Sequence, residues 1–287
     1  MWRIVPKRAV SDAIGWGAAR EIPRRLRRAL LSRFAAAYGI DVAEAEKPLE
    51  EYAGFDDFFT RRLKPGVRPI AADPDGVVSP ADGVVVECGL ATAGQLIQAK
   101  GTMFSLAELL GDQQVAARLE GGAYIITYLS PKDYHRVHSP VSGQVVGWRH
   151  LPGSLFSVGA RSVASEPGLF VRNERLVTLI DMDGGGLCAV VMVAAIGVGH
   201  VTVSYDSEVA THQREFSRAE VRHRSYDRPR PIGRGDELGI FHLGSTTIAV
   251  FEPGRATLGE FAAGTSMKMG VGIGRVVSGA SPFVARG

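Results

Sequence analysis

The chain has 287 residues, of which 45% are hydrophobic, and a formal net charge of +3, values typical of a folded globular protein with one large domain or a domain with an appendage. The apolar run at 187–198 is too short to cross a bilayer as a helix, and the N-terminus lacks the apolar core of a signal peptide, so neither a transmembrane nor a secreted form is indicated. Cys88 and Cys188 cannot form a multi-bridge framework and are expected to be buried free thiols.

The first 34 residues are strongly basic, with nine lysines and arginines against two acids. On a helix, several arginines would lie opposite an apolar stripe made of Ile22, Leu26, Ala29, Leu30 and Phe34, with Leu31 and Arg33 interrupting the pattern. Together with Trp2 and Trp16, this predicts a helix that lies on an anionic membrane. Nucleic acid is the competing partner, and a helix packed on the core is a third interpretation. The negative net charge of the remaining chain argues against nucleic acid.

Residues 41–63 are acidic and helix-favouring, and the proline-rich stretch "KPGVRPIAADPDG" that follows predicts a linker. We therefore expect a basic amphipathic helical, membrane-associating region over 1–68 and a β-rich domain over 69–287. In the second region, short Val/Ile-rich runs such as "AYIITYL" and "TTIAVF" alternate with glycines. The predicted class is α+β, with short, mostly antiparallel strands. The segments 79–86 and 139–146 both read S-P-x-x-G-x-V-V, which indicates either a duplicated strand unit or chance.

The stretch "FHLGSTTIAVF" at 241–251 breaks an apolar run at Gly244 and Ser245. A plain turn between strands explains this break, and so does a serine hydroxyl held beside a backbone carbonyl that it can attack. A nucleophilic serine needs a base and an orienting acid. The sequence order of such groups is free, but the G-x-S-x-G motif of the α/β-hydrolases is missing, which disfavours a standard serine hydrolase.

Two of the seven histidines, His135 and His138, lie in "SPKDYHRVHSP". Ser130 and the proline after it predict a short helical turn, on which both imidazoles would face similar directions. A zinc site is not expected, because no third ligand has a recognisable spacing. Asp82 in "SPADGVVV" could simply stabilise its own turn, and each histidine could be a satisfied core or surface side chain. Asp82, His138 and Ser245 nevertheless supply an acid, a base and a nucleophile.

The chain resembles the bacterial phosphatidylserine decarboxylases of the longer, membrane-associated type. The matching stretches run in order from about residue 15 to 254: "GWGAAR", "FDDFFTRRLKPGVRPI", "SPADG", "IQAKG", "TYLSPKDYHRVHSP", "PGSLFSV", "LFVRNERL" and "LGIFHLGSTTIAVFEPG". The chain departs from the family's usual residues at Gly159, Ala194, Ile196 and His200, which leaves the core motifs intact and affects the expected substrate pocket.

The resemblance implies self-cleavage between Gly244 and Ser245, after which Ser245 becomes a covalent pyruvoyl cofactor. It gives His138 the role of base, Asp82 the role of orienting acid, and His135 a role in decarboxylation. The pyruvoyl ketone would form a Schiff base with the amine of the lipid headgroup and act as the electron sink. His135, His138 or a water would then protonate the product carbon.

The resemblance further implies phosphatidylserine as substrate and phosphatidylethanolamine and CO2 as products. It implies an enzyme bound peripherally to the cytoplasmic side of the cell membrane, with an anionic membrane surface as partner. The two cleaved chains are expected to stay associated, and a homodimer is expected. Two other functions remain open: a lipid-binding protein that never matures, and a pyruvoyl decarboxylase of a soluble amino acid.

Overall fold

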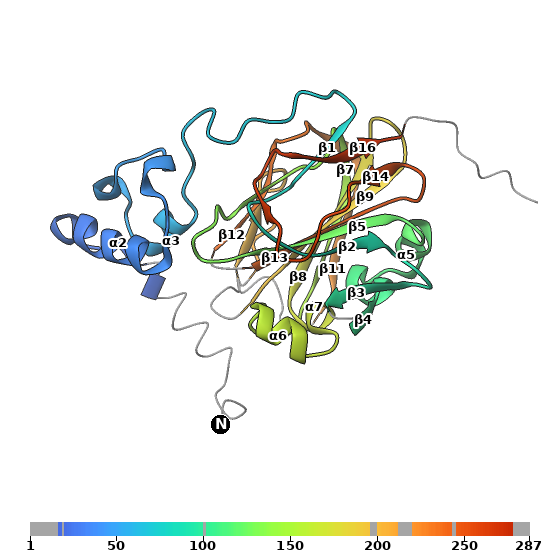
Figure 1. The fold of residues 1–287 in the computed structure, drawn as a ribbon, viewed down its shortest axis with the longest axis horizontal. Coiled ribbons are helices and arrows are strands. Elements are labelled where there is room, and N and C mark those ends of the chain that lie inside the picture. Colours follow the sequence, from blue (N-terminus) through green and yellow to red (C-terminus); the bar gives the residue numbers. More distant parts are fainter. Residues whose placement is uncertain are drawn as a thin grey trace, which may run out of the picture.

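The computed structural model describes residues 17–18, 20–99, 102–195, 200–211, 220–242 and 245–277. Residues 1–16, with Trp2 and Trp16, lie outside the described residues, as do Gly244 and Ile196. The described chain forms a small helical unit and a larger β-rich body, joined by an extended segment that leads to strand β1 (Gly76–Val78) (Figure 1).

The N-terminal helical unit is built around helix α2 (Arg24–Tyr38). The helix ends at Gly39, whose φ of 72° is left-handed and favours glycine. Two 3₁₀ turns (Val42–Glu44 and Leu49–Glu51) and the short helix α3 (Phe55–Phe59) follow. The unit has a small core of its own, made of Ile22, Leu31, Ala35, Ile40, Ala45, Tyr52 and Phe58. Among the described helices, none has both the length and the apolar composition needed to cross a bilayer.

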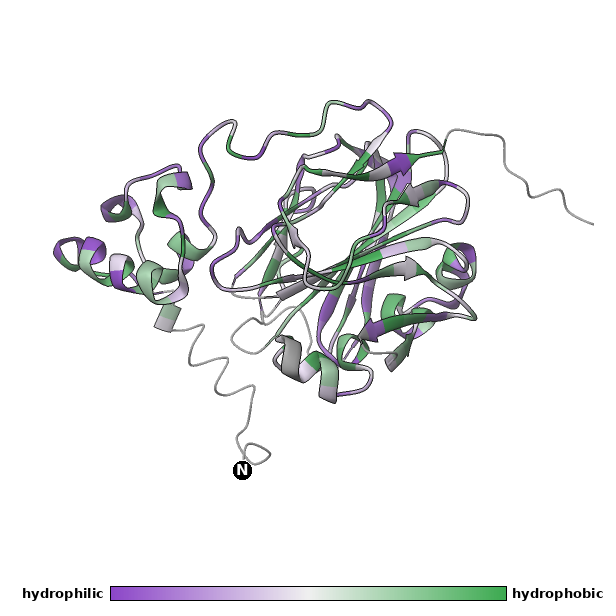
Figure 2. Cartoon of the chain, viewed as in Figure 1, coloured by the Kyte–Doolittle hydropathy of each residue, from purple (hydrophilic) through white to green (hydrophobic). Residues whose placement is uncertain are grey.

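The apolar stripe expected on α2 does not form one buried face. Leu26 and Leu30 are 44% and 36% exposed, whereas Leu31, which interrupts the predicted stripe, is fully buried. The reason is tertiary: Leu31 and Ala35, four residues apart, lie on the face that packs against the rest of the helical unit. The helix therefore has a buried apolar face and separate exposed leucines among its arginines, and both hydrophilic and hydrophobic colours appear along it in Figure 2.

The main sheet contains eight strands in the order β11-β7-β8-β9-β13-β5-β2-β15, and every neighbouring pair is antiparallel. The strands are β2 (Gly83–Leu90), β5 (Ala123–Leu129), β7 (Gly143–Leu151), β8 (Arg175–Met182), β9 (Leu187–Val193), β11 (Arg222–Ile232), β13 (Ser245–Phe251) and β15 (Ser266–Met267). Strand β13 lies between β9 and β5, and all seven of its residues are buried. Such burial on both faces explains the apolar run from Ile248 to Phe251 in its second half.

Smaller elements surround this sheet. Strands β1, β14 (Ala256–Leu258) and β16 (Gly272–Val276) form one three-stranded sheet, and β6 (Arg136–His138), β10 (Val201–Val203) and β12 (Glu237–Phe241) form another. Strands β3 (Gln95–Ala99) and β4 (Thr102–Ser105) form a hairpin, and the short helices are α4 (Leu106–Leu110), α5 (Gln113–Leu119), α6 (Ala160–Ser165) and α7 (Leu169–Arg172). The predicted β-rich, mostly antiparallel α+β class is confirmed.

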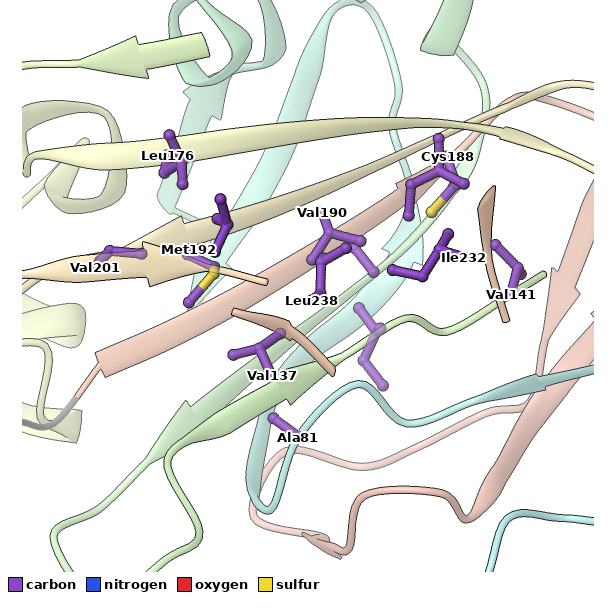
Figure 3. Packing of buried hydrophobic residues seen from close by; sticks show 14 of the residues in the cluster. Ala81, Val137, Val141, Leu176, Cys188, Val190, Met192, Val201, Ile232 and Leu238 are labelled. Carbon is purple, nitrogen blue, oxygen red and sulfur yellow. The ribbon is translucent and has the colours of Figure 1, made fainter. Parts of the chain in front are cut away.

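The eight-stranded sheet is the middle layer of the body. Side chains alternate along a strand, so Ile248 and Val250 of β13 join a core with helices α4, α5 and α7, whereas Ala249 and Phe251 join a second core. Figure 3 shows part of this second core, where Val190 and Met192 of β9 face Val137 of β6 and Leu238 of β12. The body is thus layered: the short helices cover one face of the eight-stranded sheet, and the small sheets cover the other face.

The two S-P-x-x-G segments contact each other reciprocally. The backbone amide of Val78 donates to the carbonyl of Pro140 (3.0 Å), and that of His138 donates to the carbonyl of Pro80 (2.8 Å). Each segment's serine hydroxyl donates to the carbonyl two residues later: Ser79 to Ala81 (2.9 Å) and Ser139 to Val141 (2.6 Å). In each segment the glycine begins a strand: Gly83 begins β2 and Gly143 begins β7. The segments that carry Asp82 and His138 are therefore neighbours.

Candidate active site

Ser245 is the first residue of the central strand β13, where it pairs with Leu129 at the end of β5. Its side chain is fully buried, and its hydroxyl oxygen has no hydrogen-bond partner among the described residues. A buried hydroxyl without a partner is costly, and such groups concentrate where a residue has a chemical task. The preceding residue, Gly244, lies outside the described residues.

His135 lies directly before β6 and is fully buried. Its Nδ1 is 2.8 Å from the carbonyl oxygen of Asp133; because a carbonyl can only accept, Nδ1 carries the proton and Nε2 keeps its lone pair. That Nε2 has no partner among the described residues. Burial lowers the pKa of His135 to about 3. At neutral pH it is therefore an uncharged imidazole with a free acceptor nitrogen.

His135, directly before β6, lies beside the end of β12. Strand β5, which precedes β6 in the chain, pairs with β13, and β6 pairs with β12, which precedes β13. The amide of Phe241 donates to the carbonyl of His135 (3.0 Å). The fold thus brings His135 beside Phe241, four residues before Ser245, from more than a hundred residues away in the chain.

The helical turn expected after Ser130 does not form. Instead, the side chain of Asp133 accepts hydrogen bonds from the amide (2.8 Å) and the hydroxyl (2.6 Å) of Ser130, which closes a turn, and the chain then enters β6. The Asp133 carboxylate would also suit the first turn of a helix, but here it closes the turn that replaces the helix. In extended chain, residues three apart point to opposite sides, so His135 and His138 do not face the same direction.

His138 ends β6 and is 8% exposed. Its Nδ1 donates to the carbonyl of Gly235 (2.8 Å), and its Nε2 accepts from the hydroxyl of Tyr134 (3.2 Å). Burial lowers the pKa of His138, so it too is neutral at physiological pH. Burial also raises the pKa of Tyr134 to about 12, which keeps its hydroxyl protonated as a donor. Sequence reasoning missed Tyr134, although it lies in the same motif.

Asp82 precedes β2 and is fully buried. Arg68 donates to both of its oxygens (Nε–Oδ1 2.9 Å, Nη2–Oδ2 2.6 Å), the amide of Met269 donates to Oδ1 (2.8 Å), and Lys268 Nζ lies 3.3 Å from Oδ2. None of these described contacts is with His138, whose Nδ1 is oriented by a carbonyl. The segment of Asp82 therefore reaches His138 through the backbone hydrogen bond from His138 to Pro80, and a direct acid–base hydrogen bond between Asp82 and His138 is not formed among the described contacts.

Arg68 was not recognised from the sequence, where it is one basic residue of a linker. Besides Asp82, its guanidinium contacts the carboxylate of Glu44 in the N-terminal helical unit (Nη2–Oε2 2.8 Å). Its side chain is only 7% exposed. A planar guanidinium can hold two carboxylates in a fixed arrangement, which lysine cannot. The linker therefore ties the helical unit to the carboxylate at the start of β2.

Ala194 and His200, two of the positions at which the chain departs from the family's usual residues, lie close to this region. Ala194 is buried, its carbonyl accepts from Asn173 Nδ2 (2.8 Å), and the rings of His200 and His242 lie 4.3 Å apart. His242 in turn contacts the carboxylate of Asp56 on α3 (3.0 Å). An imidazole–carboxylate pair thus lies three residues before Ser245.

The described residues thus contain a buried serine hydroxyl without a partner and two buried, neutral imidazoles, which are the kinds of group that a serine nucleophile and its base require. The family model for phosphatidylserine decarboxylase matches residues 55–275. Relatives named phosphatidylserine decarboxylase proenzyme occur in Anaeromyxobacter sp. (strain K), 45% identical over 273 residues (95% of each chain), and in Myxococcus xanthus (strain DK1622), 42% identical over 257 residues (90% of each chain). The relative of that name in Saccharophagus degradans is 41% identical over 273 residues, 93% of each chain.

This chain therefore belongs to the phosphatidylserine decarboxylase family, and the resemblance found in the sequence is confirmed. The match covers the β-rich body and reaches back into the N-terminal helical unit as far as α3.

Proposed function

We propose that this chain decarboxylates phosphatidylserine to phosphatidylethanolamine and CO2, with a pyruvoyl group that it makes from Ser245. The observation that carries the proposal is the buried, partnerless hydroxyl of Ser245 at the start of the central strand of a chain from this family. The names of the relatives, which are proenzymes, support a self-processing enzyme.

In the proposed maturation, Ser245 Oγ attacks the carbonyl carbon of Gly244 and the amide becomes an ester. Loss of the Ser245 α-proton then expels the upstream chain as a carboxylate and leaves dehydroalanine, whose hydrolysis with loss of ammonia gives the pyruvoyl group. The buried orphan atoms Ser245 Oγ and His135 Nε2 fit such a site, because both groups can take part in proton transfer. When formed, the ketone supplies the electron sink that decarboxylation of an amino acid requires.

The proposed roles of the side chains follow from their protonation. His138 and His135 are neutral, so each can accept a proton at neutral pH. We assign His138 to maturation and His135 to turnover. Asp82, held by Arg68 and the Met269 amide, acts on His138 through its field and through the backbone contact between their segments, rather than by a direct hydrogen bond.

Two finer parts of the fold are also proposals. The reciprocal hydrogen bonds of the two S-P-x-x-G segments support a duplicated strand unit. The exposed Leu26 and Leu30 among the arginines of α2 support an N-terminal region, residues 1–68, that binds an anionic membrane on its cytoplasmic side. Strand β13, paired on both sides, supports continued association of the two cleaved chains, and the homodimer stays a prediction.

The test is the intact mass of the purified protein together with an assay for CO2 release from phosphatidylserine. Wild-type protein should separate under denaturing conditions into chains of residues 1–244 and 245–287, the second with the mass of an N-terminal pyruvoyl group. The Ser245→Ala variant should stay full length and inactive. A wild-type protein that is full length and inactive would favour the non-maturing lipid-binding protein, and release of CO2 from free serine alone would favour the soluble-substrate decarboxylase.

A further inference from the structure

Arg61 is a buried cation with unused hydrogen-bond donors. The residue is 3% exposed, and its Nη2 donates to the carbonyls of Lys132 (3.1 Å) and Asp133 (3.4 Å). Its Nε and Nη1 have no partner among the described residues, and no described carboxylate forms an ion pair with it. Burial of a charge without a counterion is strongly unfavourable unless the site serves to bind one.

The position of this cation is close to the reaction site. The carbonyl oxygen of Asp133 that accepts from Arg61 Nη2 also accepts from His135 Nδ1 (2.8 Å). The ring of Phe59, two residues before Arg61, lies 4.0 Å from the His135 imidazole. Arg61, which the N-terminal helical unit contributes, therefore shares an acceptor oxygen with the imidazole that we assign to turnover.

A polar cavity of about 70 Å³ is lined by Arg61 and its neighbours. Basic side chains outnumber acidic ones in its lining, which includes Lys47, Arg61, Arg62 and Arg136 with Glu46 and Asp57. The other charges are partly engaged: Arg136 and Arg62 contact Glu237, and Asp57 accepts from the amide of Ala53. Among the lining cations, Arg61 is the one with buried donors that lack a partner within the described residues.

We infer that Arg61 binds the phosphodiester of the lipid headgroup, an inference that rests on the proposed function. The headgroup carries two anions, a phosphodiester and a carboxylate. The carboxylate loses its charge as CO2 leaves, so an arginine bound to it would stabilise the ground state and oppose the reaction. The phosphodiester keeps its charge throughout, and its oxygens can accept two parallel hydrogen bonds from one planar guanidinium. Arg61 thus contributes equally to ground state and transition state, which lowers KM and leaves kcat largely unchanged.

The first experiment measures kcat and KM of the processed enzyme with a short-chain phosphatidylserine that stays in solution. Arg61→Met should raise KM about 10- to 100-fold, the loss expected for one charge-assisted hydrogen bond, with a much smaller change in kcat. Arg61→Lys keeps the charge with fewer donors and should fall between Arg61→Met and wild type. Arg118→Met is the matched control, because Arg118 is a half-exposed arginine on α5 that pairs with Glu252, beyond the far end of β13.

The second experiment measures binding to the uncleaved Ser245→Ala protein by calorimetry, with inorganic phosphate, serine and the short-chain lipid as separate probes. Phosphate should bind and compete with the lipid, serine should not compete, and Arg61→Met in this background should abolish phosphate binding. The inference is overturned if the double variant binds phosphate like its parent, if phosphate binds without competing with the lipid, or if Arg61→Met lowers kcat alone. Failure of wild-type decarboxylation would instead overturn the proposed function, while phosphate binding to the Ser245→Ala protein would still report on Arg61.

Discussion

His135 shows how burial prepares a side chain for chemistry at a cost in stability. Desolvation removes its charge at neutral pH, and the Asp133 carbonyl fixes its tautomer, so that Nε2 is presented as an acceptor. The same burial opposes protonation of the folded protein at low pH. The catalytic state of the imidazole and the acid sensitivity of the fold therefore have one physical origin.

The burial of His135 predicts that the stability of the fold depends on pH. The unfolded chain protonates His135 near pH 6.5 and the folded chain near pH 3, so between these values the unfolded state binds more protons and the free energy of unfolding falls as the pH is lowered. One such group contributes a slope of up to about 1.4 kcal/mol per pH unit. In urea titrations of the uncleaved Ser245→Ala protein, adding His135→Gln should reduce the slope by about that amount within this window. Equal slopes with and without His135 would contradict its burial as an uncharged group.

The assigned roles predict different failures for three variants. His138→Ala and Asp82→Asn should slow the appearance of the two chains on a gel by about 10²- to 10⁴-fold, the usual effect of losing a general base or its support. His135→Ala should still be cleaved but should release little CO2 per processed chain. Cleavage of His138→Ala at the wild-type rate would show that another group, such as His135, is the base.

The buried ion pair between Arg68 and Asp82 predicts a large effect of substituting Arg68 on stability. Arg68 and Asp82 are 7% and 1% exposed, so Arg68→Met leaves a buried carboxylate without its bidentate partner and should lower the free energy of unfolding by about 3–5 kcal/mol. The matched control is Arg172→Met, which breaks a half-exposed ion pair with Glu166 and should cost at most about 1 kcal/mol. Both are measured by urea unfolding of the Ser245→Ala protein. Similar losses for the two variants would mean that Asp82 does not depend on Arg68.

At the scale of elements, strands were predictable where burial dominates the sequence. The runs at 123–129 and 246–251 are rich in apolar and β-branched residues because their strands are covered on both faces of the main sheet, and this signal is local. Helix α2 was harder, since the choice between Leu30 and Leu31 as the buried residue depends on what the rest of the helical unit places against it. The turn after Ser130 was misread because one carboxylate can serve a turn or a helix equally well.

The site was predictable only in part for the same reason. Asp82, His138 and Ser245 are each visible as residue types in motifs, and the fold brings their segments together. The partners of those residues are not visible, because Arg68, Lys268 and Gly235 reach them through tertiary contacts across as many as 186 residues of chain. A sequence pattern therefore indicates which groups react and leaves open what orients them.

Strand β13 predicts that processing does not separate the chains. After cleavage, the 43-residue chain of residues 245–287 would still begin with a strand that is hydrogen-bonded on both sides and would still supply β15 and β16 to two sheets. The processed protein should elute as one species from size-exclusion chromatography in high salt, because buried ladders and apolar cores are little screened. Amide hydrogens of 247–250 should exchange with solvent at the slow, global rate. Loss of the short chain on the column would contradict this arrangement.

At the scale of the whole molecule, the charge is polarised. Nine basic residues lie in the first 34, while the chain as a whole carries only +3. In the described part of this region, α2 presents arginines together with Leu26 and Leu30, while Arg61 of the same helical unit reaches His135 through the Asp133 carbonyl. A unit that touches both a membrane and the headgroup site would keep the lipid tails in the bilayer during the reaction, which is why the two proposals support each other.

This arrangement predicts two separable contributions to membrane binding. Each arginine near an anionic surface contributes about 1 kcal/mol and is screened by salt, whereas the exposed leucines add an apolar contribution that salt does not weaken. Co-sedimentation of the full-length protein with vesicles that contain anionic lipid should therefore weaken but persist at high salt. The double variant Leu26→Glu and Leu30→Glu should fold normally, because both side chains are exposed, and should lose the binding that persists at high salt.

Leu90→Glu is the matched control, since Leu90 is 65% exposed at the end of β2 opposite to Asp82 and carries the same change from leucine to an acid. It should bind vesicles like wild type at every salt concentration. A protein without residues 1–38 should lose both contributions. If instead that shortened protein binds anionic vesicles as well as the full chain does, α2 serves only to pack the helical unit, and the membrane contact must lie on the β-rich body, where the exposed basic strand β11 would be the first surface to substitute.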